Sequence, residues 1–167
     1  MTVAEVVIEH RRANLFEVRA DAIVNPWNRN FVPRWLLRPG GVSGELKKRT
    51  GPAPWRDLRA RGVLRLGEAV ITDAGHYPNA HAIIHVAGIN ARWRASEESV
   101  RLSTRNAVRT ARAHGLGSMV MPLIGAGHGG LDPKHSLDAT IAALEEERLV
   151  VGQPRLVVTI ADRSGGR

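Results

Sequence analysis

Short apolar runs alternate along this chain with segments whose apolar positions recur every three to four residues. The short runs are bounded by Gly, Pro, Asn or Asp, which is typical of strands in a buried sheet. The pattern predicts an opening strand or hairpin from the runs at 3–9 and 16–18, and further strands at 21–25, 68–72, 82–87, 118–124 and 156–160.

Helical periodicity and helix-end signals predict four helices between these strands. Ser96 and Asp132 are typical N-cap residues, and Pro133 suits the first position of a helix. The predicted helices run from 42–43 to about 50, from 54 to 61, from the N-cap Ser96 to about 114, and onward from the N-cap Asp132. Strands that alternate with helices favour an α/β fold with a mainly parallel sheet.

The length of 167 residues predicts one domain, 1–167, with a short flexible tail at about 163–167. No segment approaches the ~20 consecutive apolar residues that span a bilayer, and no basic-plus-apolar secretory start is present. The sequence contains no cysteine, which excludes disulfides and thiolate chemistry and fits a reducing compartment. A cytoplasmic location without membrane association is therefore expected.

The formal net charge of +8 comes almost wholly from arginine, because lysine occurs only at positions 47, 48 and 134. A basic surface attracts polyanions such as nucleic acids electrostatically, and this attraction depends on salt but not on the nucleic-acid sequence. An arginine-rich, lysine-poor composition is also typical of proteins from GC-rich genomes. Both explanations stay open, and a weak electrostatic association with nucleic acid is one expectation.

Two glycine-bearing loops each follow a predicted strand, PGGVSG at 39–44 and GAGHGG at 125–130. Glycine permits positive φ and lets a ligand approach main-chain N–H groups closely. Runs of such N–H groups, especially at a helix N-terminus, bind anions. Two loops of this kind predict a diphosphate held from both sides.

Five segments, in order, resemble motifs of the macrodomain family, which reads DAIVNAAN, GGGVxxAI, GEAVIT, IHAVGP and FPxIGTG. The matching segments are DAIVNPWN at 21–28, GGVSGEL at 40–46, GEAVIT at 67–72, IHVAG at 84–88 and MPLIGAG at 121–127. The resemblance covers about residues 13–162.

The resemblance implies a three-layer α/β/α sandwich with a mixed, mainly parallel central sheet and ADP-ribose in a cleft at the strand ends. The diphosphate would lie between 40–44 and 125–130, with the distal ribose near Asn28. Members of the family hydrolyse ADP-ribose from protein carboxylates or only bind it, so the implied partners are ADP-ribose and mono-ADP-ribosylated proteins, with no metal and no cofactor. The implied ligand-binding residues are Asn14, Leu15, Ile23, Asn25, Gly40, Gly41, Val42, Ser43, Gly44, Ile124, Gly125, Ala126, Gly127, Gly129 and Ala161.

Five positions depart from the family pattern. The Asp that contacts adenine is Asn14 here, and the aromatic residue that stacks on adenine falls at Ala161. In the hydrolase branch an acid follows the first glycine loop and a histidine comes four residues later. This chain has Ser43 and Lys47 at these two positions. The aromatic residue of the second loop aligns near Gly129.

The implied reaction is removal of ADP-ribose from glutamate or aspartate side chains, with three catalytic candidates. Asn28 would hold the distal ribose, and His128 would polarise water or contact the sugar. Glu45 would be a displaced base, or it would only favour the N-terminal dipole of its helix.

Three other functions stay open. The chain could be a reader that binds ADP-ribose without turnover, as Ser43 would allow. Residues 125–130 also satisfy the GxGxxG string of nucleotide-dependent oxidoreductases, although that fold opens with the string. An arginine stripe at 101, 105, 109 and 112 could bind nucleic acid, although it is also typical of a solvated helix face.

Overall fold

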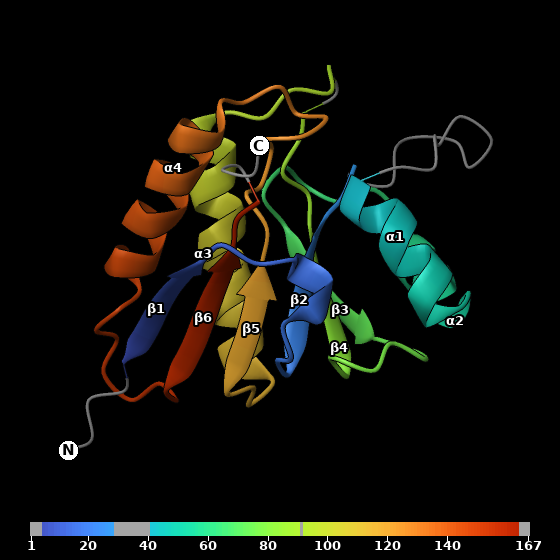
Figure 1. The fold of residues 1–167 in the computed structure, drawn as a ribbon, viewed down its shortest axis with the longest axis horizontal. Coiled ribbons are helices and arrows are strands. Elements are labelled where there is room, and N and C mark those ends of the chain that lie inside the picture. Colours follow the sequence, from blue (N-terminus) through green and yellow to red (C-terminus); the bar gives the residue numbers. More distant parts are fainter. Residues whose placement is uncertain (1–4, 29–40, 91, 164–167) are drawn as a thin grey trace.

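The computed structural model describes residues 5–28, 41–90 and 92–163, and its centre is a six-stranded sheet in the order β1-β6-β5-β2-β4-β3 (Figure 1). The strands are β1 (Val6–Arg11), β2 (Ala22–Pro26), β3 (Ala69–Asp73), β4 (Ala82–Val86), β5 (Ser118–Met121) and β6 (Leu156–Ala161). All neighbouring pairs are parallel except β3 with β4. The predicted mixed, mainly parallel sheet is confirmed.

Four α-helices among the described residues cover the two faces of the sheet. They are α1 (Gly41–Thr50), α2 (Ala53–Ala60), α3 (Glu97–Ala113) and α4 (Pro133–Glu146). None of them combines the length and the apolar character that crossing a bilayer requires.

Alternate residues of the central strands point to opposite faces of the sheet, and each face has its own core. In β2, Val24 packs in the core under α3 and α4, whereas Ile23 packs in the core under α1 and α2. In β4, Ile84 and Ile83 repeat this division. The result is the three-layer α/β/α sandwich that the sequence predicts.

Two predicted strands differ from the structure. The run at 16–18 is a 3-10 helix, Leu15–Glu17, because the side chain of Asn14 caps it by accepting a hydrogen bond from the N–H of Phe16 at 3.2 Å. No opening hairpin forms, since β1 pairs in parallel with β6 from the other end of the chain. The strand predicted at 118–124 ends at Met121, because Pro122 has no N–H to continue the ladder.

Parts of three predicted segments lie outside the described residues. They are residues 3–4 of the predicted opening strand, residues 39–40 of the first glycine loop, which include Gly40, and residues 164–167 of the predicted tail. These parts remain predictions.

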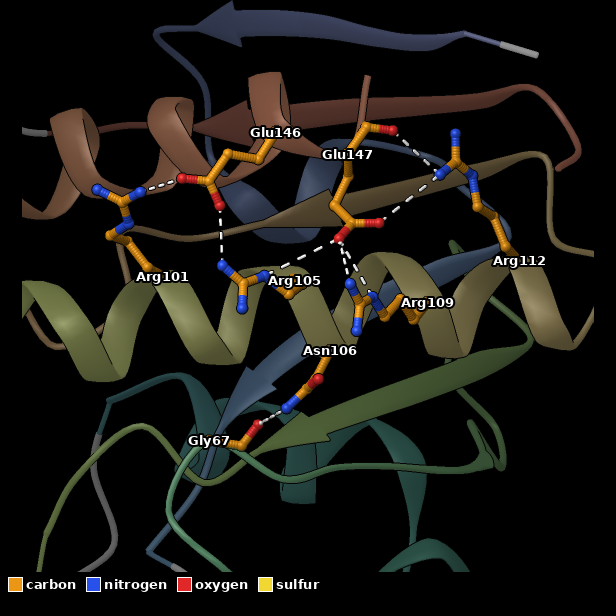
Figure 2. A network of polar contacts seen from close by, with 8 residues as sticks. All are labelled: Gly67, Arg101, Arg105, Asn106, Arg109, Arg112, Glu146 and Glu147. Carbon is orange, nitrogen blue, oxygen red and sulfur yellow. Dashed lines mark hydrogen bonds and ion pairs between the residues drawn. The ribbon is translucent and has the colours of Figure 1, made fainter. Parts of the chain in front are cut away.

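The arginine stripe of α3 contacts the two acids at the end of α4 (Figure 2). The stripe comprises Arg101, Arg105, Arg109 and Arg112, and the acids are Glu146 and Glu147. Glu147 is nearly buried and accepts two hydrogen bonds from Arg109, at 2.9 and 3.1 Å. Buried Arg112 donates to the carbonyl oxygen of Glu147 at 3.1 Å. The stripe joins α3 to α4, so it does not support the nucleic-acid hypothesis.

A chain of buried hydrogen bonds runs from α1 across the sheet to β3. The Ser43 hydroxyl donates to the side-chain oxygen of Asn25 at 2.8 Å, which leaves the Asn25 amide to donate to Nδ1 of His85 at 3.0 Å. Nδ1 therefore carries no proton, and Nε2 donates to the Thr72 hydroxyl at 2.9 Å. Thr72 in turn donates to the carbonyl oxygen of Asp73 at 3.0 Å. Every member has a partner, so the chain fixes the start of α1 on β2 and β4.

Burial, with a smaller contribution from the positive charge of Arg61, lowers the pKa of His85 to about 3. The imidazole is fully buried and neutral at any pH near 7. A charged ring would also present an N–H to the amide of Asn25, which is itself a donor. His85 is therefore a fixed, neutral member of the chain of buried hydrogen bonds.

The two acids of the α3–α4 network provide a matched pair for stability. Glu147→Gln removes a carboxylate that is only 7% exposed and leaves buried Arg112 without its counter-charge. We expect it to lower the free energy of unfolding in urea by about 3 kcal/mol. Glu146→Gln, at a carboxylate 40% exposed, should cost less than about 1 kcal/mol. Equal effects of the two substitutions would contradict a structural role for the buried acid.

The state of His85 predicts a pH dependence of stability. Its pKa is lower in the folded chain than in the unfolded chain, so the unfolded chain binds more protons as the pH falls below 6.5, and stability is lost in that direction. Between pH 7.5 and pH 5 this single group should account for about 2 kcal/mol of the free energy of unfolding. The glutamine of His85→Gln cannot titrate. Between pH 7.5 and pH 5 the free energy of unfolding of this variant in urea should therefore fall by about 2 kcal/mol less than that of the native protein. An identical pH slope in the two proteins would show that His85 titrates normally when folded.

Candidate ligand-binding site

A cavity of about 1220 Å³ lies at the carboxyl ends of β2, β4 and β5, between the start of α1 and the loop that follows β5. Loops and helix N-termini converge at this edge of an α/β sheet, and ligands bind there for that reason. Its lining is Pro26, Trp27, Asn28, Gly41, Val42, Ser43, Gly44, Lys47, Lys48, Gly51, Pro52, Trp55, Arg56, Arg59, Gly88, Ile89, Trp93, Pro122, Leu123, Ile124, Gly125, Gly127, His128 and Gly129.

The first wall is the N-terminal turn of α1, residues 41–44. The backbone N–H groups of a first helical turn have no partner within the helix, and the helix dipole gives them positive charge. Gly41 has φ +60°, a conformation that disfavours other residues. Ser43 keeps the turn in place by donating to Asn25 and to the carbonyl oxygen of Pro26, at 2.8 and 3.2 Å. The wall is therefore a prearranged helix turn of the kind that suits an anion.

The second wall is the glycine loop after β5, and it has no room for larger residues at two positions. Gly125 has φ +78°, and a Cβ there would lie 2.3 Å from Cβ of Ala95. A Cβ on Gly129 would lie 2.7 Å from the carbonyl oxygen of Gly125. Two hydrogen bonds also hold the loop in place. The N–H of Ala95 donates to the carbonyl oxygen of Gly129 at 3.0 Å, and the hydroxyl of Ser136 donates to the carbonyl oxygen of Ile124 at 2.7 Å. Its backbone is therefore held at a fixed distance from α1.

His128 brings the two walls together. A Cβ on Gly41 would lie 3.5 Å from both Cδ2 and Nε2 of this ring, so the imidazole lies beside the first residue of α1. The ring is otherwise exposed on the cavity side. It is in a position to contact a ligand that spans both loops.

Asn28 lies two residues beyond β2 and lines the cavity while only 6% exposed. Trp27 extends the strand pairing by donating its N–H to the carbonyl oxygen of Val86 at 2.7 Å. That pairing places Asn28 against the cavity floor. A nearly buried amide at this point can bind the hydroxyl groups of a sugar.

The structure brings most of the predicted site residues to this one cavity. They are Asn28, Gly41, Val42, Ser43, Gly44, Ile124, Gly125, Gly127, His128 and Gly129. Asn25 lies behind the wall and supports Ser43. Gly40 lies outside the described residues. The roles of these residues remain predictions.

Several predicted residues do not line the cavity. Leu15, Ile23 and Ala161 are buried in the core under α1 and α2, and Ala126 is also absent from the lining. Asn14 uses its amide locally, accepting from Phe16 and donating to Glu17 at 3.1 Å. Its predicted contact with adenine is therefore not supported.

Glu45 also lies off the cavity wall. Its carboxylate accepts a hydrogen bond from Arg49 at 2.9 Å and lies 3.6 Å from the ammonium of Lys48. The hydrogen bond from Arg49 is the main cause of the lowered pKa of Glu45. Glu45 is absent from the described lining, and its hydrogen bond with Arg49 does not favour the role of a displaced base, which stays a prediction.

Lining residues on α2 and on the loop before α3 were not predicted. Trp55, Arg56 and Arg59 lie on one side of α2, and their i, i+1, i+4 spacing is the sequence signal that could have indicated a shared face. Trp93 lines the rim with φ +60°, a strained conformation for a residue other than glycine, and strain of this kind gathers at functional sites. No sequence signal predicts that conformation. The described residues contain no group of three or more histidines and acids arranged to share a metal ion.

Comparison with known proteins agrees with this geometry. A protein of Aeropyrum pernix is 30% identical over 96% of this chain and 81% of its own length. A protein of Mycobacterium tuberculosis is 28% identical over 87% of this chain, which covers only 39% of that protein. A variant of the Oceanobacillus iheyensis macrodomain, solved with ADPR, superimposes with a TM-score of 0.76 at 20% identity, over 99% of this chain and 89% of that one.

The family model described as Macro domain matches residues 24–140, from the middle of β2 to the middle of α4. The match includes both walls of the cavity and Asn28 between them. The chain belongs to the macrodomain family.

Proposed function

We propose that this macrodomain binds ADP-ribose and hydrolyses its bond to glutamate or aspartate side chains of mono-ADP-ribosylated proteins. The observation that carries the proposal is the cavity itself, in which two glycine-rich backbone walls face each other with Asn28 at the floor. The solved relative with bound ADPR supports the choice of ligand. The proposal concerns this chain, and a longer protein could add further activities.

The diphosphate would lie between the first turn of α1 and the loop after β5, held by main-chain N–H groups from both sides. His128, which lies beside Gly41, would close over it. The distal ribose would then extend toward Asn28, whose amide can both donate to and accept from its hydroxyl groups.

Hydrolysis requires a water molecule at the anomeric carbon of the distal ribose. The water oxygen forms a bond to that carbon while the bond to the carboxylate oxygen breaks, and the proton of the water passes to solvent or to His128. The products are free ADP-ribose and an ionised side-chain carboxylate. Because a carboxylate is a good leaving group, positioning and electrostatic stabilisation can supply most of the rate enhancement.

A reader without turnover is the second candidate. It is favoured by Ser43, which stands where the hydrolase branch has its acid, and by the lining of the described part of the cavity, which includes no Asp or Glu. The two candidates share the same ligand and differ only in what happens to the bond at the anomeric carbon.

Release of ADP-ribose from a glutamate-linked substrate separates the two candidates. We expect the native chain to release it and Asn28→Ala to slow the release by about tenfold or more, which corresponds to about 1.4 kcal/mol of transition-state stabilisation. Calorimetry with free ADP-ribose on the same two proteins is the control. Binding without release by the native chain would identify a reader.

Two glycines of the second loop test its geometry. Gly129→Ala adds a Cβ that meets backbone at 2.7 Å, whereas Gly127→Ala adds one with no atom within 4 Å. We expect Gly129→Ala to cost about 1–3 kcal/mol of stability through overpacking and to weaken ADP-ribose binding by about tenfold, with Gly127→Ala within about 0.5 kcal/mol of native stability. Native affinity in Gly129→Ala would show that this loop does not hold the diphosphate.

A further inference from the structure

The cavity continues past the two glycine walls into an extension formed by the later turns of α1 and by α2. The charged residues that line the described part of the cavity all belong to this extension, and all four are cationic: Lys47, Lys48, Arg56 and Arg59. The two glycine walls already provide backbone N–H groups for a diphosphate. Lys48 also lies 3.6 Å from the carboxylate of Glu45, and the other three cations would favour a second negative charge in the same cavity.

Lys47 is the most constrained of these cations. Its Nζ lies 4.9 Å from the ring centroid of Trp27 and 5.1 Å from that of Trp55, so the ammonium lies over two indole faces. The face of an indole ring attracts a cation. Because the ring has no net charge, this contact does not neutralise the positive charge of the ammonium. Lys47 is also only half-buried, so its ammonium can meet a ligand.

The two indoles form a rigid support. Both are buried, and their centroids lie 5.5 Å apart. The indole N–H of Trp55 donates to the Thr50 hydroxyl at 2.9 Å, and its ring meets the edge of His85 at a centroid distance of 5.4 Å. The support is thus tied to the same buried chain that positions Ser43 and Asn25.

The position of Lys47 separates it from the diphosphate walls. It follows Gly41 by six residues, which is about 9 Å along a helix axis. Its support includes Trp27, which is adjacent in sequence to Asn28 at the proposed distal-ribose position. Lys47, Trp27 and Asn28 line the same cavity, so the ammonium lies in the space that would receive the group attached to that ribose.

We propose that Lys47, held by Trp27 and Trp55 and assisted by the field of Arg56 and Arg59, forms an oxyanion subsite for the group attached to the distal ribose. The subsite rests on the proposed function, because its ligand is the leaving group of that reaction. A carboxylate ester is neutral when bound and becomes negative as the bond breaks, so Lys47 would act in the transition state. A phosphate ester is negative throughout, so Lys47 would act in binding.

Binding measurements test the subsite separately from hydrolysis. By calorimetry, native protein should bind ADP-ribose phosphorylated on its anomeric hydroxyl about tenfold more tightly than ADP-ribose, and Lys47→Met should abolish that preference while leaving the affinity for ADP-ribose unchanged within about threefold. Methionine keeps a flexible apolar stem against the indoles, so the fold is retained. Lys47→Arg keeps the charge and should restore part of the preference. Lys134→Met is the matched control, because that lysine is paired with Asp138 on α4 and lies outside the cavity.

Kinetics with a glutamate-linked substrate test the transition-state role. Lys47→Met should lower kcat by about tenfold with KM within about threefold of native. If Lys47→Met retains both the binding preference and kcat while native protein binds ADP-ribose, the subsite is wrong and the proposed function stands. If native protein fails to bind ADP-ribose at all, the proposed function fails, and the subsite fails with it.

Discussion

The hydrogen bond between the Ser43 hydroxyl and the side-chain oxygen of Asn25 is the contact on which the arrangement of the site depends. It joins the first turn of α1 to the end of β2, and it decides the orientation of the Asn25 amide. That orientation in turn fixes the proton of His85 on Nε2 and directs it to Thr72. An anion-binding helix turn is useful only if it stays at a fixed distance from the opposite wall, and a fully satisfied buried chain provides that rigidity.

The sequence predicts the architecture because its signals are local and repeated. The N-caps Ser96 and Asp132 act over a few residues and appear where predicted, and the strand alternation predicts the six strands of the sheet, although the run at 16–18 forms a 3-10 helix. Predictions that depended on aligning a residue with a family role were weaker. Asn14 stands where adenine recognition was expected, yet its spacing to Glu17 is that of a capping pair, and the side chain caps the 3-10 helix. The structure thus shows a local structural role for Asn14, and its contact with adenine stays a prediction.

Other features of the site depend on tertiary contacts that no short pattern encodes. Glu45 faces Arg49 because α1 packs through Leu46, which turns the neighbouring carboxylate away from the cavity. Trp55 reaches the cavity because α2 packs against α1 and β3, and its ring contacts His85 of β4. The net charge of +8 likewise does not indicate which cations could contact a ligand. The arginines of α3 form ion pairs with the acids at the end of α4, whereas Lys47 lines the cavity.

The charge distribution of the cavity also constrains its chemistry. Since the described lining holds cations but no carboxylate, this site cannot activate water with an acidic side chain from those residues. In the proposed reaction the main acceleration would then come from stabilising the charge that leaves, and a cation fixed in place before the reaction costs no reorganisation when that charge develops. In the proposed subsite the two indoles would hold the ammonium of Lys47 in place, and the described lining has no carboxylate to repel the ligand's own phosphates. On this proposal, the two positions that carry an acid and a histidine in the hydrolase branch can be Ser43 and Lys47 here and still serve the same bond, provided that the leaving group, rather than the water, receives the main electrostatic assistance.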